Sequence, residues 1–159
     1  MPQNLKIIIH PDKRLRQLSR VVSPQEITDP EFQAFLQDMD LTMKNKDGAG
    51  LAAPQVGQLK RVILVAGEKK SMVMINPQIT KKSWAKIIEE EGCLSVLNEK
   101  GEIIYAPVER HKKINCLYLD EKGQPKKISA EKMLARVIQH EIDHLDGILF
   151  IDKIAKKKN

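Results

Sequence analysis

The pentad His140-Glu141-Ile142-Asp143-His144 constrains the fold more than any other segment of the chain. Residues four apart on a helix lie on the same face, so both histidines of such a pentad can bind one metal ion. Glu141 lies one residue further round, where it can reach a water on that metal and accept its proton. Asp143 faces away from both histidines and is expected in solvent or in a salt bridge. The pentad therefore predicts a helix that carries part of a hydrolytic metal site.

A catalytic metal site needs three protein ligands and one open position, and the pentad supplies two of the ligands. Phe150 occupies the position at which a metzincin carries its third histidine. A downstream glutamate, as in thermolysin-like proteases, is also excluded, because no Glu follows His144. The third ligand must therefore come from upstream of the helix.

Cys93 is the preferred third ligand, because it follows an expected strand and because the adjacent Gly92 lets the backbone approach closely. A buried, inert thiol remains the alternative for this residue. Cys116 alternates with apolar neighbours and is interpreted as a small buried hydrophobe. His111 belongs to a charged run and is expected in solvent, whereas His10 precedes a proline and is expected in a turn or cap. A thiolate with two imidazoles suits Zn(II), Fe(II), Co(II) or Ni(II), so the ligand types do not choose the metal.

The length of 159 residues fits one compact domain, with 153–159 as a short lysine-rich tail. The hydrophobic fraction of 42% and the charged fraction of 30% are typical of a globular protein and exclude disorder or a collagen-like chain. No apolar run is long enough to span a bilayer, and the first residues lack the apolar segment of a secretory signal, so no membrane attachment is expected. Two cysteines give no disulfide framework and favour a reducing compartment.

The net charge of +6 is concentrated near the end of the chain, where four lysines fall within the last seven residues: Lys153, Lys156, Lys157 and Lys158. Without these lysines the chain carries only +2. Aromatic residues make up 4%, and no basic stripe with interleaved Phe or Tyr is present. Neither a broad nucleic-acid-binding face nor sequence-specific nucleic-acid binding is therefore expected. The tail could contact RNA, but a solvated terminus is the favoured interpretation.

Apolar spacing indicates an α+β fold, with a block of strands between two helices. The first helix is predicted over 29–46, with Asp29 as N-cap and Pro30 at the first helical position. The second is predicted to begin near Ser129 as N-cap and to end at about Leu145, with Gly147 as the terminating residue. Strands are expected at 5–9, 62–66, 72–75, 85–88, 103–108 and 114–119, with Asn76-Pro77 ending the third of them.

Residues 48–55 form a glycine-rich segment, Gly-Ala-Gly-Leu-Ala-Ala-Pro-Gln. It lacks the Gly-Lys-Ser/Thr ending of a phosphate-binding loop, so phosphate binding is not expected. Its small residues allow an extended peptide to lie close, and the Gln55 amide could donate a hydrogen bond to an oxyanion. An ordinary helix-to-strand connection explains the segment equally well.

Three segments, taken in this order, resemble the signature of the peptide deformylases: GAGLAAPQ at 48–55, EGCLS at 91–95 and QHEIDHLDG at 139–147. Further similarity at His10-Pro11-Asp12, Asn76-Pro77 and 149–152 extends the resemblance over nearly the whole chain. The resemblance implies an α+β fold in which antiparallel sheets surround a central helix carrying the metal motif. It also implies removal of the N-formyl group from the N-terminal methionine of newly synthesised polypeptides, with release of formate.

The resemblance implies a role for each residue of the expected site. Three residues would hold Fe(II), which Zn(II), Ni(II) or Co(II) can replace: Cys93, His140 and His144. Water or hydroxide would occupy the fourth position, and Glu141 would accept its proton and later deliver the proton to the leaving amine. The Gln55 side chain and the Leu94 backbone N–H would stabilise the tetrahedral oxyanion.

The same resemblance places the substrate peptide in an extended conformation beside Gly50 and Gly92, with backbone hydrogen bonds like those of an added strand. Val137, one turn before Glu141, is expected to line the methionine pocket. Arg110 either holds a peptide carbonyl or pairs with an acid such as Glu91, and both alternatives stay open.

Four residues depart from the family pattern around the expected pocket. Ala49 stands where a larger aliphatic residue is common, and Arg136 lies where apolar residues are frequent. Leu97-Asn98 follows the cysteine segment where many members have Pro-Gly. These departures concern the shape of the pocket and remove no catalytic group.

A formylated initiator implies a bacterium or a bacterium-derived organelle, and the lack of a transit segment favours the bacterial cytoplasm. The basic tail could contact the ribosome weakly through attraction to phosphates. Two other functions stay open: a different metallo-amidase or peptidase with the same site, and a catalytically silent homologue that binds nascent chains or ribosomes. The intact Glu141 speaks against the silent homologue, because a pure binding module needs no base beside an open metal position.

Overall fold

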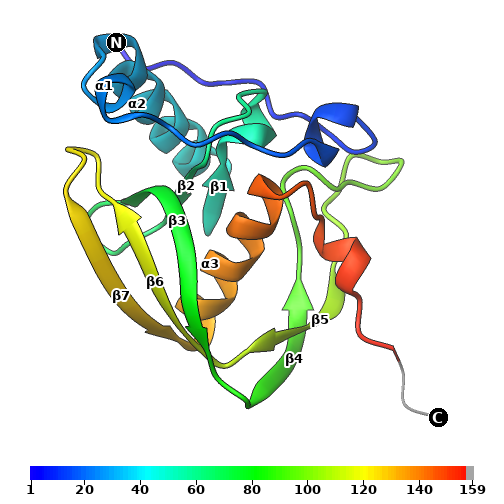
Figure 1. The fold of residues 1–159 in the computed structure, drawn as a ribbon. Helices are drawn as coiled ribbons and strands as arrows, with labels where there is room; N and C mark the ends of the chain where they lie inside the picture. The colour runs from blue at the N-terminus through cyan, green and yellow to red at the C-terminus, as the bar shows by residue number, and fades with distance from the viewer. Residues whose placement is uncertain (157–159) are drawn as a thin grey trace.

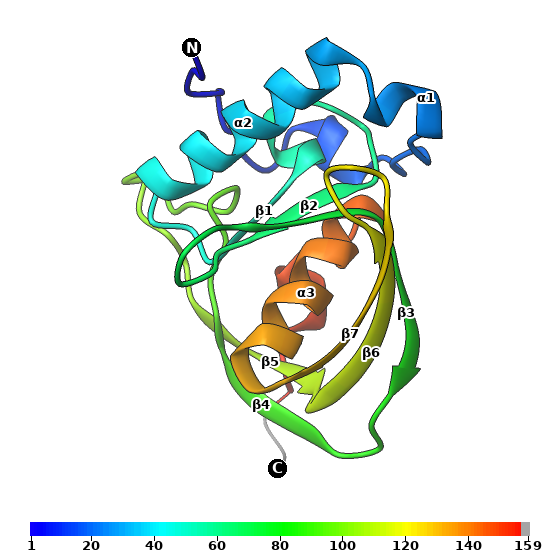
Figure 2. The same ribbon diagram turned by 90° about the vertical axis from the view of Figure 1, so that its left-hand side faces the viewer.

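The computed structural model describes residues 1–156 and places one helix, α3, between two antiparallel sheets (Figures 1 and 2). The larger sheet has the strand order β1-β2-β3-β6-β7, and the smaller sheet pairs β4 with β5. The strands are β1 Gly50–Ala52, β2 Val62–Val65, β3 Met72–Lys82, β4 Lys86–Glu91, β5 Ala106–His111, β6 Lys113–Leu119 and β7 Pro125–Glu131. The helices are α1 Pro24–Ile27, α2 Pro30–Asn45 and α3 Lys132–Leu145, with short 3-10 turns at Lys13–Arg16, Ala53–Val56 and Phe150–Lys153. The predicted α+β fold is confirmed.

The place of α3 follows from its apolar stripe. Residues on one face recur every three or four positions and are buried against the five-stranded sheet: Ala135, Ile138, Ile142 and Leu145. Burying one large apolar side chain contributes roughly 1.5–3 kcal/mol. The stripe therefore decides which face of α3 meets the large sheet, and it leaves the polar residues of the helix toward β4 and β5: Arg136, Gln139, His140 and Asp143.

A second apolar layer lies on the other side of β1 and β2, where α2 packs through a stripe of buried residues, Phe32, Leu36, Met39 and Met43, with the partly buried Phe35 beside it. The side chain of Asp29 accepts a hydrogen bond from Glu31 N at 2.7 Å, and Pro30 occupies the first turn. The predicted first helix is therefore confirmed. Both faces of β2 are buried, since Leu64 packs toward α2 and Ile63 toward α3.

The predicted start of the second helix is wrong. Ser129 belongs to β7, where it pairs with Asn115 of β6 and donates a side-chain hydrogen bond of 2.8 Å to the Asn115 amide oxygen. The helix begins three residues later, at Lys132, which has a positive φ of 57°. Strand pairing with β6 therefore overrides the capping preference of the serine. The predicted end is confirmed, because α3 stops at Leu145 and Gly147 follows with a φ of 72°.

Two strand predictions are also wrong. Residues 5–9 are extended but join no sheet, and they are held by single backbone bonds such as Ile8 N to Gln55 O at 2.7 Å. Strand β3 does not end at Asn76-Pro77. Asn76 takes a positive φ of 51° in a bulge, and its side chain makes two 2.9 Å hydrogen bonds with the backbone of Val22, so the strand continues to Lys82.

The lysine-rich tail predicted from residue 153 is partly ordered against β5. Ile154 bridges Val108, and Ala155 N donates to Pro107 O at 2.8 Å. Residues 157–159, with Lys157 and Lys158, lie outside the described part of the chain. Within 1–156, no helix combines the length and the apolar character needed to cross a bilayer.

Candidate metal centre and active-site cavity

The three residues predicted as metal ligands converge in the structure. The ligand atoms of Cys93, His140 and His144 all lie within 4.8 Å of one another, and the three residues are buried. His140 and His144 come from successive turns of α3, and Cys93 comes from the segment after β4. The Cys93 sulfur lies 3.3 Å from His144 Nε2 and accepts a hydrogen bond from Ser95 N at 3.4 Å. Two distant segments therefore present sulfur and nitrogen atoms to one point.

A buried carboxylate fixes the orientation of His140. Glu91 Oε1 lies 2.8 Å from His140 Nδ1, so an N–H on that nitrogen donates to Glu91 and leaves Nε2 with its lone pair. Arg110 donates two hydrogen bonds to the same carboxylate, at 2.8 and 2.9 Å, and Arg136 donates a third. Burial works to raise the pKa of Glu91, but the hydrogen bonds from Arg110 and His140 outweigh it and hold the pKa well below its usual range. Glu91 is therefore a charged acceptor behind the ligand.

The residues present fit a divalent metal ion. Burial, followed by the nearby His140, holds the pKa of His144 well below 6.5, which keeps this imidazole neutral as a metal requires. His144 Nδ1 and Glu141 Oε2 are buried polar atoms with no hydrogen-bond partner in the described part of the chain. One thiolate and two imidazoles form a ligand set that transition metals such as zinc and iron accept.

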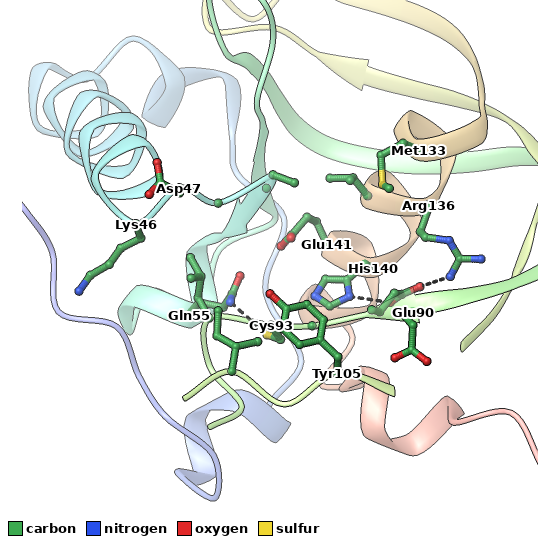
Figure 3. A pocket seen from close by; sticks show the side chains of 18 residues that line it. Lys46, Asp47, Gln55, Glu90, Cys93, Tyr105, Met133, Arg136, His140 and Glu141 are labelled. Atoms are coloured by element: carbon green, nitrogen blue, oxygen red, sulfur yellow. Dashed lines mark hydrogen bonds and ion pairs between the residues drawn. The ribbon is translucent and has the colours of Figure 1, made fainter. Parts of the chain in front are cut away.

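Glu141 lies buried beside the ligands, with its side chain directed into the cavity (Figure 3). Burial raises the pKa of this carboxyl group to about 7, against the lowering effect of His140. A general base works best when its pKa lies near the operating pH. A Cβ at Gly50 would lie 2.8 Å from both Cγ and Oε1 of Glu141 and 2.9 Å from Val137. The predicted importance of Gly50 therefore has a steric reason, since only glycine leaves room for this carboxylate.

A cavity of about 280 Å³ opens over these groups. Five of the residues predicted to contact the substrate or the oxyanion line this cavity: Gly50, Gln55, Gly92, Leu94 and Val137. Gln55 is buried, donates to Ser95 Oγ at 3.1 Å and has its amide nitrogen 3.5 Å from the Cys93 sulfur. Its carbonyl oxygen accepts from Ala52 N at 2.9 Å, which fixes the amide with its N–H groups toward the site.

Arg110 does not line this cavity. Its guanidinium group donates to Glu91 and, at 2.5 Å, to Asp143, and only 3% of the side chain is exposed. Of the two alternatives for this residue, the geometry supports the ion pair, and the assignment of Arg110 to substrate binding is corrected. Arg136 borders the cavity but directs its guanidinium away, toward Glu91 and the carbonyl oxygens of Ile87 and Val108.

The other sequence-derived candidates lie outside the ligand cluster. Cys116 is buried in β6, and burial raises the pKa of its thiol to about 11, as expected of an inert packing residue. His10 lies in a turn, as predicted. His111 is half-buried rather than solvated, because its Nδ1 lies 2.7 Å from Ser83 O. Asp143 forms the predicted salt bridge.

Three residues with large apolar side chains line the cavity but were not predicted from the sequence: Ile103, Tyr105 and Met133, of which Figure 3 labels the last two. A Cβ at Gly92 would lie 2.7 Å from the Tyr105 ring, which shows how closely that ring covers the segment before Cys93. Met133 lies four residues before Val137 on the same helix face, so the helical spacing that selected Val137 could also have found it. Tyr105 fell in the strand expected at 103–108, which begins only at Ala106 in the structure, and strand spacing alone gave no signal for the cavity.

Two imidazoles, one cysteine sulfur and a buried carboxyl group beside a cavity are the groups that a metal-dependent hydrolase site requires. The family model described as "Polypeptide deformylase" matches residues 4–159. A peptide deformylase of Treponema pallidum is 45% identical over 141 residues, which cover 89% of this chain and 84% of that protein. A peptide deformylase of Rhizobium meliloti is 41% identical, with 96% and 86% covered. This chain therefore belongs to the polypeptide deformylase family and is an enzyme of that family.

Solved structures agree with this assignment. The peptide deformylase of Thermotoga maritima has a TM-score of 0.89 and 34% identity, covering 97% of this chain and 99% of that chain. A peptide deformylase of Acinetobacter baumannii bound to Met-Ala-Ser has a TM-score of 0.88 and 34% identity, covering 97% and 100%. The Synechococcus elongatus enzyme in complex with actinonin has a TM-score of 0.87 and 39% identity, covering 96% and 80%.

Proposed function

We propose that this chain removes the N-formyl group from the N-terminal methionine of nascent polypeptides and releases formate, with Glu141 as general base and general acid. The observation that carries the proposal is the position of the buried Glu141 carboxyl group, which faces the same cavity as Cys93 and His140 of the metal-ligand cluster. At neutral pH this group can both accept and return a proton. Membership of the deformylase family supports the choice of a formamide as the bond that is broken.

Cys93, His140 and His144 would hold the metal in this proposal. When bound, a divalent ion lowers the pKa of a coordinated water and polarises the formyl carbonyl. Fe(II) is the proposed ion, and Zn(II), Ni(II) or Co(II) can take its place, since all accept a thiolate with two imidazoles. Glu91 supports the site by holding the Nδ1–H of His140, which keeps Nε2 available as a ligand atom.

The remaining roles follow from the cavity. The Gln55 Nε2–H and the Leu94 backbone N–H would donate to the oxyanion that forms as water attacks the formyl carbon. Glu141 would pass its proton to the amine nitrogen as the carbon–nitrogen bond breaks. Val137 and Met133 form an apolar wall suited to the methionine side chain, and Gly50 and Gly92 leave space for an extended peptide backbone.

The cellular setting is proposed on the same basis. The relatives named above are bacterial, which supports the bacterial cytoplasm as the proposed location of the reaction. The whole chain, 1–159, would form one catalytic domain. The basic residues of 153–159 would make a weak contact with the ribosome through its phosphates.

The substrate is tested with formyl-Met-Ala-Ser and anaerobically prepared, iron-loaded protein. We expect formate and free Met-Ala-Ser in equal amounts, with no cleavage between the three residues. Cleavage of an internal peptide bond would identify a different metallopeptidase. Folded, metal-loaded protein that releases no formate but binds the peptide would identify a silent homologue.

The ligand set is tested by a pair of cysteine variants. Cys93→Ser should lower bound metal, because a neutral hydroxyl replaces a thiolate, whereas Cys116→Ser removes a thiol of similar burial outside the cluster. Elemental analysis after gel filtration measures both. Equal loss of metal in the two variants would contradict the assignment of Cys93.

A further inference from the structure

A basic surface lies where β3 turns into β4 and β5 turns into β6, at the lower end of the molecule in Figure 1. Backbone hydrogen bonds join these two turns, since Ser83 N donates to Lys113 O at 2.9 Å and Lys112 N donates to Ala85 O at 3.0 Å. The first residue of α3 joins them, with Lys132 N donating to Lys112 O at 3.3 Å. Six exposed lysines gather on this surface, called the basic tip: Lys81, Lys82, Lys86, Lys112, Lys113 and Lys132.

The lysines of the basic tip outnumber the carboxylates beside them. Two carboxylates lie among its lysines, with Glu131 Oε2 3.2 Å from Lys113 Nζ and Glu109 Oε2 3.6 Å from Lys86 Nζ. Both pairs are exposed and therefore weak. With these two acids counted against the six lysines, the local charge of the tip is +4. The sequence did not reveal this surface, because its lysines belong to three segments that meet only in the fold.

Trp84 stands in the turn between β3 and β4 and is fully exposed, at 100%. It is the only tryptophan of the chain. Tryptophan is highly buried on average in folded proteins, so a ring without packing contacts is available to a partner. An aromatic ring among lysines is the arrangement that binds single-stranded nucleic acid, because a base stacks on the ring and the cations attract the phosphates. The turn offers one large apolar side chain, which is too little for insertion into a membrane surface.

We propose that the basic tip binds single-stranded or looped RNA without sequence specificity. Trp84 stacks on an unpaired base, and the surrounding lysines attract the flanking phosphates. The residues of the tip do not line the catalytic cavity, so this surface is separate from the active site. The proposal concerns a second function of the chain and does not depend on the deformylase reaction.

The test uses the full chain at low salt and a single-stranded RNA of roughly 12 nucleotides, a length within the range that such sites cover. Because Trp84 is the only tryptophan, its fluorescence reports on the tip directly. We expect RNA to quench this emission. We also expect the logarithm of affinity to fall with the logarithm of salt concentration, with a slope of about −0.7 for each phosphate contacted.

Matched variants locate the binding surface. Lys112→Glu combined with Lys113→Glu should weaken RNA binding at least about tenfold and reduce the salt slope by about 1.4, the value for two phosphate contacts. Lys126→Glu combined with Lys127→Glu removes the same charge from exposed residues at the other end of β7 and should change affinity less than about twofold. Trp84→Leu should lose roughly tenfold in affinity, measured by anisotropy of labelled RNA, because base stacking is removed.

All three variants should keep wild-type formate release from a short formylated peptide. Equal losses of RNA binding in the two lysine pairs would overturn the proposal, because they would indicate general charge attraction. Unchanged Trp84 emission on RNA addition would also overturn it, as would binding that depends only on the lysines of 153–159. Tighter binding to phosphatidylglycerol vesicles than to RNA, with a blue shift of Trp84, would assign the tip to a membrane surface instead.

Discussion

The face of α3 that meets the five-stranded sheet is apolar, whereas the face that meets β4 and β5 is held by hydrogen bonds and ion pairs. Apolar contacts are non-directional, so the first face decides where the helix lies but tolerates small rotations. The hydrogen bonds that converge on Glu91 are directional, so the second face decides how the His140 ring is turned. One helix therefore separates the two tasks: one face stabilises the fold, and the other orients the His140 ring, the proposed metal ligand.

The largest expected effect comes from removing the centre of the polar face. Glu91→Ala leaves Arg110 and Arg136 buried without their shared acceptor, and we expect the free energy of unfolding to fall by about 3–5 kcal/mol. Metal affinity should also fall, by about 10–100-fold, because His140 loses its orienting partner. Urea unfolding and metal titration measure the two effects. Glu90→Ala, at the exposed neighbouring position, is the control, and equal effects in the two variants would contradict the role of Glu91.

Truncating a side chain on the apolar face should lower the free energy of unfolding somewhat less than Glu91→Ala does. Ile138 is fully buried against the large sheet, and Ile138→Ala should lower the free energy of unfolding by about 2–4 kcal/mol through lost burial and a cavity. Metal bound per folded molecule should stay at the wild-type value, since the polar face is unchanged. Ile88→Ala, where half of the side chain is exposed, is the matched truncation and should cost far less. Loss of metal from folded Ile138→Ala protein would break the proposed division between the faces.

Gly50→Ala tests whether Glu141 needs the position that it has at the edge of the cavity. The new methyl group would collide with Glu141 and Val137, so we expect catalytic turnover to fall at least about tenfold through displacement of the base. The free energy of unfolding should also fall, by about 1–3 kcal/mol, because the new Cβ would meet Cγ of the buried Glu141 and Cγ1 of Val137 as well as the carboxylate oxygen. Formate release and urea unfolding are measured on the same preparation. Wild-type turnover in this variant would show that Glu141 does not need its observed position.

The smallest effect is expected at an exposed ion pair remote from α3. The hydrogen bond from Arg20, helped by Lys60, lowers the pKa of Glu26 from 4.5 to about 2. The charged carboxylate therefore adds stability above pH 4.5, and this contribution is lost as the pH falls toward 2. Glu26→Gln should cost at most about 1 kcal/mol at pH 7, with the difference from wild type shrinking on acidification. If the difference in stability between wild type and Glu26→Gln grows as the pH falls, the pKa of Glu26 is not lowered by folding.

The two faces of α3 also differ in how far the sequence predicts them. The helical spacing of His140, Glu141 and His144 and the glycine beside Cys93 indicated the metal cluster, because these signals are local. Local sequence signals could not predict that the Glu91 carboxylate contacts His140. Glu91 meets its partners across gaps of 19 to 49 residues, which the pairing of β4 with β5 and the packing of α3 close.

Other predictions failed where tertiary contacts outweighed local preference. Ser129 is a favourable cap, yet pairing with Asn115 keeps it in β7. Asn76-Pro77 has the composition of a strand end, yet the hydrogen bonds of Asn76 to Val22 carry β3 through a bulge. The roles of Gln55 and Leu94 at the oxyanion stay predictions, although both residues line the cavity.

The central claim is that Glu141 serves as the base of a metal site that the polar face of α3 aligns. Glu141→Gln keeps the size of the side chain and removes its ability to accept a proton. Metal content and formate release from formyl-Met-Ala-Ser are measured together in this variant and in wild type. The account predicts wild-type metal content with formate release reduced by about 10²–10⁴-fold. Formate release near the wild-type rate from metal-loaded Glu141→Gln protein would contradict it.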